Sequence, residues 1–134
     1  MANQLFNPGR EGFLDGTINW ASGDIRVMLV KSTYVWDATD KFVADLGAVD
    51  NGRSTALLNK TVTDGVADAD DISLVATAAV ACSALVIFQH TGNDATARLI
   101  AFINTPIAGL PFTPAAGQTV NITWDAGADR IFKL

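Results

Sequence analysis

The sequence predicts an all-β protein, an antiparallel β-sandwich of jelly-roll-like form with about eight strands and one short helix. Segments in which apolar and polar residues alternate recur along the 134-residue chain and are rich in Val, Ile, Thr and aromatic residues. Such alternation is typical of strands that are buried on one face. Turn signals rich in Gly, Asn and Asp separate these segments at regular spacing, and only one segment favours a helix.

The N-terminal segment is expected to be an extended arm over residues 1–12, followed by a single β-sandwich domain over residues 13–134. Asn7, Pro8 and Gly9 follow one another in the arm, and these residue types are typical of loops. A short strand is expected over residues 17–20, just before a Ser-Gly-Asp turn.

A longer strand is expected over residues 24–31, with Ile25, Val27 and Leu29 on one face. Its other face carries Met28 and Val30 and is only partly polar, so we expect both faces to be covered.

The helix is expected over residues 37–47. Thr39 can cap its N-terminus and Gly47 suits its end. Its apolar residues fall on one face: Phe42, Val43 and Leu46. Tyr34 and Trp36, just upstream, are expected to pack beneath it, because so short a helix needs tertiary contacts to be stable.

Turns and strands alternate through the rest of the chain. Turns are expected at the Asp-Asn-Gly of residues 50–52 and at the Asp-Gly of residues 64–65, which favours a hairpin. The expected strands cover residues 54–63, 72–77, 81–90, 98–104, 119–125 and 130–134. Three of the four prolines lie in a stiff connector over residues 105–118, which suggests strands that cross between sheets.

The composition favours a protein that binds a partner through apolar surface. Hydrophobic residues make up 49% of the chain and charged residues 17%, against roughly 25% charged residues in average proteins. A small domain with so few charges is expected to expose apolar patches, which usually mark interaction sites. The net charge is −5 and the nine Lys and Arg residues are scattered, so nucleic acid is not an expected partner. No segment resembles a membrane span or a signal peptide.

No arrangement of residues predicts an enzyme, a cofactor or a metal site. The single histidine, His90, has no evident catalytic partner, and the single cysteine, Cys82, lies in an apolar run. An acidic cluster is compatible with calcium, but its DGVADADD sequence does not match the EF-hand loop, so a solvated loop is favoured: Asp64, Asp68, Asp70 and Asp71. The tryptophans Trp20, Trp36 and Trp124 are expected in the core rather than in a sugar site.

Four segments together cover nearly the whole chain and resemble a widespread family of small virion proteins of tailed bacteriophages. They read FLDGTINWASGDIRVMLV, KTVTDGVADADDISL, ALVIFQHTGNDATARLIAFI and GLPFTPAAGQTVNITWDAGADRIFKL. Several members look like capsid decoration (cement) proteins, which bind the outer shell and stabilise it. The resemblance implies synthesis in the host cytoplasm, a place on the capsid surface of the virion, and the major capsid protein as partner. It also implies a homo-oligomer, with a trimer favoured, and it transfers no catalytic residue.

Two segments are the expected contacts with the partner, because arms that order on binding and edge strands that pair are recurrent ways to join chains. Their candidate residues are Leu5, Phe6 and Pro8 in the arm and Pro106, Leu110, Pro111 and Phe112 in the connector. A tail, baseplate or adaptor protein is the alternative. A carbohydrate-binding module or small hydrolase is a more remote one, and it would use Trp36, Asp94 or His90 in a cleft.

Overall fold

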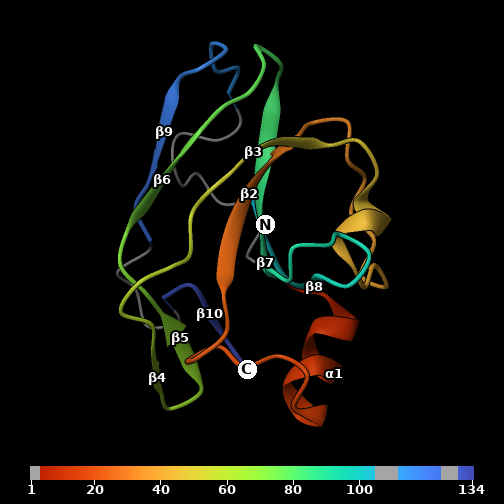
Figure 1. Ribbon diagram of the computed structural model, residues 1–134, viewed down its shortest axis with the longest axis vertical. Helices are drawn as coiled ribbons and strands as arrows, with labels where there is room; N and C mark the ends of the chain where they lie inside the picture. The colour runs from red at the N-terminus through yellow and green to blue at the C-terminus, as the bar shows by residue number, and fades with distance from the viewer. Residues whose placement is uncertain (1–3, 105–111, 125–129) are drawn as a thin grey trace.

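The computed structural model describes residues 4–104, 112–124 and 130–134, and ten strands in these ranges form three antiparallel sheets (Figure 1). The predicted all-β, sandwich-like fold is confirmed. The largest sheet has the order β1 (Gln4–Leu5), β8 (Arg98–Ile103), β7 (Cys82–Gln89), β2 (Ile25–Lys31) and β3 (Asp50–Arg53). A three-stranded sheet has the order β10 (Phe132–Lys133), β5 (Val66–Asp68) and β4 (Thr61–Thr63). The third sheet pairs β6 (Ile72–Val75) with β9 (Thr119–Ile122).

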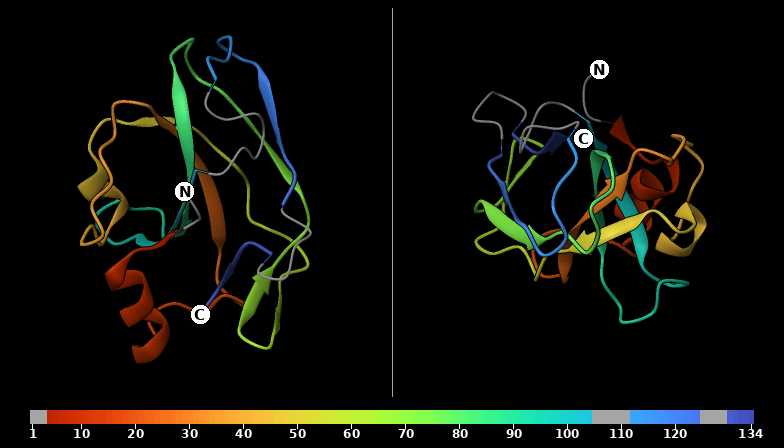
Figure 2. Two further views of the ribbon diagram at one scale, coloured as in Figure 1. Left: turned by 180° about the vertical axis from the view of Figure 1, so that it is seen from behind. Right: turned by 90° about the horizontal axis from the view of Figure 1, so that it is seen from above.

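The five-stranded sheet is the middle layer of the molecule, and both of its faces are covered, as the sequence of β2 predicts. Ile25, Val27 and Leu29 belong to a core cluster shared with residues of β5, β6, β9 and β10. Met28 and Val30 belong to a second cluster on the opposite face. Figure 2 shows the two small sheets on one side of the central strands and the helical segments on the other.

The N-terminal segment is not an extended arm, and this expectation is wrong from residue 4 onward. β1 pairs with β8, and α1 (Asn7–Asp15) follows at once. Pro8 stands in the first turn, where its missing N–H costs no hydrogen bond, and Gly16 ends the helix at φ 82°. The loop-like composition reflects close packing, because a Cβ on Gly9 would lie 2.8 Å from the Leu99 carbonyl oxygen of β8.

The predicted helix over residues 37–47 is reduced to a single 3₁₀ turn, η1 (Val43–Leu46). Asp45 accepts hydrogen bonds from the backbone N–H groups of Lys41 and Phe42, which fixes the start of this turn. Val43 and Leu46 are buried in the second cluster, and Tyr34 and Trp36 pack against it.

Three further expectations about local structure are wrong. Residues 50–52 form strand β3 rather than a turn, and no strand forms over residues 17–20. The strand expected over residues 54–63 is reduced to the three residues of β4. The long apolar strands were predicted within one to a few residues: β2, β7, β8 and β9. In β9 the alternation is confirmed, since Val120 and Ile122 are buried while Thr119 and Asn121 are exposed.

Candidate interaction site on the small sheet

The β4–β5 hairpin has a tight two-residue turn. Asp64 and Gly65 have φ values of 54° and 78°, so both adopt the left-handed conformation that a type I′ turn requires. Asp and Gly tolerate this conformation better than other residues, which is why the sequence predicts the turn correctly. The register opposes Thr63 with Val66 and Val62 with Ala67.

The register leaves one strand edge open. Ala67 directs its backbone toward β10, since its carbonyl oxygen accepts a hydrogen bond of 3.1 Å from the Ile131 N–H. Backbone groups alternate in direction along a strand, so Val62, opposite Ala67, turns its N–H and C=O away from β5. All three residues of β4 are exposed, and no other described strand pairs with its outer edge.

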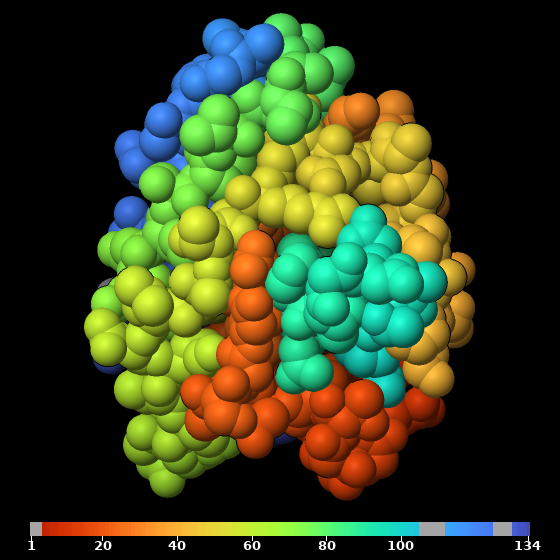
Figure 3. All heavy atoms as spheres, in the orientation of Figure 1, coloured from red at the N-terminus to blue at the C-terminus, as the bar shows by residue number. Residues whose placement is uncertain are grey.

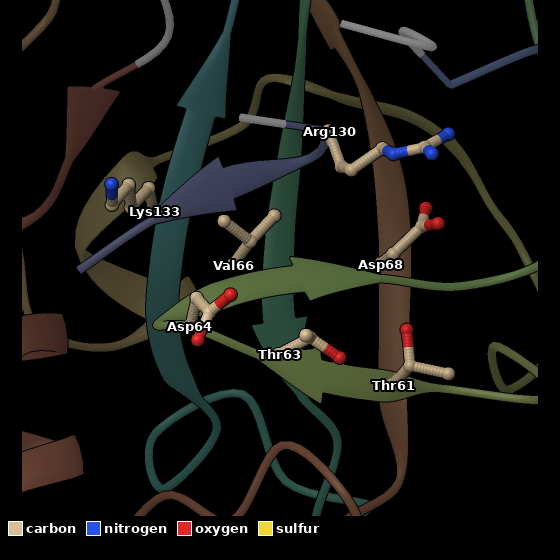
Figure 4. A pocket seen from close by; sticks show the side chains of 7 residues that line it. All are labelled: Thr61, Thr63, Asp64, Val66, Asp68, Arg130 and Lys133. Carbon is tan, nitrogen blue, oxygen red and sulfur yellow. The ribbon is translucent and has the colours of Figure 1, made fainter. Parts of the chain in front are cut away.

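The outer face of this sheet is a shallow polar hollow of about 490 Å³ (Figure 4). Thr61 and Thr63 of β4 point into it beside Asp68 of β5. Asp64 lies at the turn, and the hollow is bordered by Arg130, just before β10, and by Lys133 of β10. The surface therefore offers acidic, basic and hydroxyl groups together, which suits a polar macromolecular surface better than a ligand of one charge.

The inner face of the same sheet forms one wall of an apolar groove of about 250 Å³. Residues of α1, of the following loop and of the small sheet line it: Phe13, Ile18, Trp20, Val62, Ala67, Phe132 and Leu134. The molecule is hollowed at this end, between the β4–β5 lobe and α1 (Figure 3). Val62 and Leu134 are 60% and 59% exposed, so this apolar wall continues onto the surface.

One polar atom in the groove wall is unsatisfied. Trp20 is 4% exposed, and its buried indole N–H has no hydrogen-bond partner among the described residues. Its ring meets the Phe132 ring edge-on, with the centroids 5.2 Å apart. An indole N–H usually finds an acceptor when it is buried, so this donor is an unusual feature of the groove wall.

Lys60, immediately before β4, ties the hairpin to the loop that follows Trp20. Its ammonium group donates a hydrogen bond to the Gly23 carbonyl oxygen. Partial burial lowers the pKa of Lys60, because desolvation disfavours the charged form.

The predicted contact residues of the N-terminal segment lie inside the molecule. Leu5 and Phe6 are 6% and 0% exposed, and Pro8 is buried in α1. As folded they cannot reach a partner, which corrects the expectation that they form a docking arm. Phe112 is half-buried and pairs with Cys82, with its N–H 3.0 Å from the Cys82 carbonyl oxygen.

The other predicted contact residues, Pro106, Leu110 and Pro111, lie outside the described residues and stay a prediction.

The residues expected to form a carbohydrate site make other contacts within the fold. The Trp36 ring packs 4.7 Å from Phe6 and 5.0 Å from Phe102, between ring centroids. Asp94 accepts two hydrogen bonds from Arg53, at 2.7 and 2.8 Å, and this contact lowers the pKa of Asp94. Neither hollow described above is lined by Trp36, Asp94 or His90.

The acidic cluster is dispersed in the fold. Asp71 accepts a hydrogen bond from the Trp124 N–H, and Asp70 accepts one from Asn59. Asp64 and Asp68 face the polar hollow. Over the described ranges, no group of three or more His, Cys, Asp or Glu residues is placed to hold a metal ion.

Sequence reasoning missed the groove, because its walls come from segments far apart in the chain. A signal for the open edge was present, since the TVTDGVAD pattern predicts a short hairpin with hydroxyl-bearing strands.

Comparison of the chain with protein-family models, with curated proteins and with solved structures finds no match. Among the described residues, no helix is both long enough and apolar enough to cross a membrane.

Proposed function

We propose that the protein is a structural component of a tailed-bacteriophage virion, and specifically a decoration protein that binds the outer capsid shell and stabilises it. The resemblance of its four segments to small virion proteins supports this role, which requires a rigid scaffold with an adhesive surface rather than a reaction centre. The partner in this proposal is the major capsid protein.

The structural observation that carries the proposal is the apolar groove beside the small sheet. Its rim exposes Val62 and Leu134, and its wall contains the unsatisfied Trp20 indole N–H. Exposed apolar surface that continues into a groove, together with an unused donor, is the kind of site into which a segment of another protein packs. A shell protein would place an apolar side chain in the groove, against Val62 and Leu134.

The first test is the copy number of the protein in purified virions, measured by quantitative mass spectrometry against the major capsid protein. A ratio near one, or a simple fraction of it, is the expected result for a protein that follows the shell lattice. A handful of copies per particle would contradict the proposal and favour the tail or baseplate alternative.

The second test is binding of the purified chain to shells that lack it. Leu134→Glu places a charge at the groove rim and is expected to weaken binding about tenfold or more, because the carboxylate loses water in the contact. Val35→Glu is the matched control, since Val35 is 81% exposed and lies outside the groove. Equal binding by both variants would show that the groove is not the contact.

A further inference from the structure

We propose that the open edge of β4 pairs with the same edge of a second copy of this chain, across a two-fold axis, to form one continuous six-stranded sheet. The inference concerns the edge of the small sheet and does not rest on the proposed capsid role. It starts from the direction of the Val62 backbone groups, which face outward and have no partner among the described strands.

The sequence around Val62 is self-complementary when it is read antiparallel to itself. It runs Lys60, Thr61, Val62, Thr63, Asp64. Centring two copies on Val62 places each Thr61 opposite a Thr63 of the other copy, and it brings Lys60, just before the strand, near the turn residue Asp64 of the other copy. Thr–Thr pairs and opposite-charge pairs both stabilise antiparallel strands.

Parallel pairing of the same two edges is disfavoured by charge. It would place Lys60 opposite Lys60 and Asp64 opposite Asp64, and like charges directly opposite each other are destabilising. The charge pattern therefore selects the antiparallel arrangement, which a two-fold axis generates and which closes at two copies.

The shape and chemistry of the edge fit this arrangement. Figure 1 places β4 at the margin of the molecule, outside β5 and β10. Val62 and its symmetry mate would exchange two backbone hydrogen bonds, and their exposed side chains would cover one another. Lys60 already donates to Gly23, but an ammonium group has three donors and can also meet a carboxylate.

Three-residue edge strands normally escape self-association because they are short and flanked by charge. Here the flanking charges have opposite signs at the two ends of the strand. Antiparallel pairing therefore brings the positive end of one copy next to the negative end of the other. The joined edge also brings the two apolar grooves side by side, since Val62 lies at the rim of each.

The test measures the mass of the full chain by sedimentation over a wide concentration range, at low ionic strength. The unmodified chain is expected to move from monomer to dimer as concentration rises. Hydrogen exchange at the Val62 amide is expected to slow in step. A chain that stays monomeric throughout would overturn the proposal and leave the edge to a different protein, and a trimer would overturn it equally.

Charge reversal identifies the contact. Lys60→Glu makes both ends of the strand acidic, and Asp64→Lys makes both ends basic, so each variant alone is expected to dimerise about tenfold more weakly. Mixing the two variants restores opposite charges at both ends, and the mixture is expected to form a heterodimer.

This mixing experiment distinguishes a variant that has lost the dimer contact from one that has misfolded, because a misfolded variant would not associate with the other variant. Lys133→Glu is the matched control. It makes the same charge change on β10, at the opposite edge of the sheet, and is expected to dimerise like the unmodified chain. If the mixture fails to associate, or if Lys133→Glu also loses the dimer, the contact does not lie at the β4 edge and the proposal is wrong.

Discussion

Asn51 is a fully buried polar residue whose side chain joins β3 to the segment that leads into β7. Its amide nitrogen donates to the Ala78 carbonyl oxygen and to the Cys82 sulfur, both at 3.1 Å. Its amide oxygen accepts from the Ala78 N–H at 2.9 Å and from the Thr77 hydroxyl at 3.0 Å. Every hydrogen-bonding position on the side chain is thereby satisfied inside the protein.

Asn51→Ala is expected to lower the free energy of unfolding by about 2–4 kcal/mol, because buried donors and acceptors around the cavity lose their partner. Chemical denaturation measures the loss. The control is Asn121→Ala, which removes an exposed amide on β9 and is expected to cost less than about 1 kcal/mol. Similar losses for both variants would show that burial of Asn51 is not the cause.

The same residue explains an error in reading the sequence. Asp-Asn-Gly is a strong turn signal when only local conformation is considered. Here Gly52 does have a positive φ of 128°, but Asn51 is held in a strand by groups 26 to 31 positions away. Hydrogen bonds to residues so far along the chain cannot be predicted from the local sequence around Asn51.

At the scale of elements, α1 shows how small residues allow a helix to lie directly on a sheet. Pro8, Gly9 and Gly12 are its buried residues. A Cβ on Gly9 would lie 2.8 Å from the Leu99 carbonyl oxygen and 2.9 Å from that of Ile100. The buried Arg98 of β8 ties the first turn down, donating to the Pro8 carbonyl oxygen at 2.5 Å.

Gly9→Ala is expected to destabilise the protein by about 1–3 kcal/mol, although alanine is the better helix former, because the added methyl group separates α1 from β8. Thermal unfolding measures the effect. Glu11→Ala, at an exposed position of the same helix, is the control and is expected to be nearly neutral. A stabilised Gly9→Ala protein would mean that the helix does not pack this closely.

Elements with strong hydrophobic periodicity were therefore predictable and elements made of small residues were not. The run from Arg98 to Ile103 is buried at every position, and its apolar sequence predicts a central strand. The helix contributes little apolar periodicity, so its composition resembles that of a loop. The reverse error at η1 arose because a helical apolar spacing was present where tertiary contacts allow only one turn.

At the scale of the whole molecule, two core clusters share one sheet. Leu85 and Ile87 of β7 belong to the cluster facing the small sheets, and Val86 and Phe88 belong to the cluster facing the helical side. Unfolding of either cluster would disrupt the strands that also carry the side chains of the other cluster. We therefore expect the protein to unfold in one cooperative transition.

Val86→Ala tests this expectation. It is expected to cost about 2 kcal/mol and to reduce hydrogen-exchange protection equally on both sides of the central sheet, including β6 and β9. Val75→Ala, at a residue that is 53% exposed, is the control and should change protection little. Loss of protection confined to the helical side would show that the two clusters unfold separately.

The candidate site was predictable only in part for the same reason. The hairpin turn and the hydroxyl-rich strand are local features that the sequence displays. The groove requires Trp20, Phe13 and Phe132 to meet, and no periodicity relates residues so far apart. The expected docking arm failed because Phe6 fills the chain's own core.

Cys82 has a practical consequence that follows from its place beneath Asn51. It is the only cysteine in the sequence and is 0% exposed, and burial raises the pKa of its thiol. The thiolate is the form that attacks an alkylating reagent, so Cys82 in the folded chain is shielded both by packing and by protonation. Cys82 therefore serves as a natural probe of opening in the central sheet. The rate at which its thiol is alkylated reports how often the sheet opens, and no cysteine needs to be introduced.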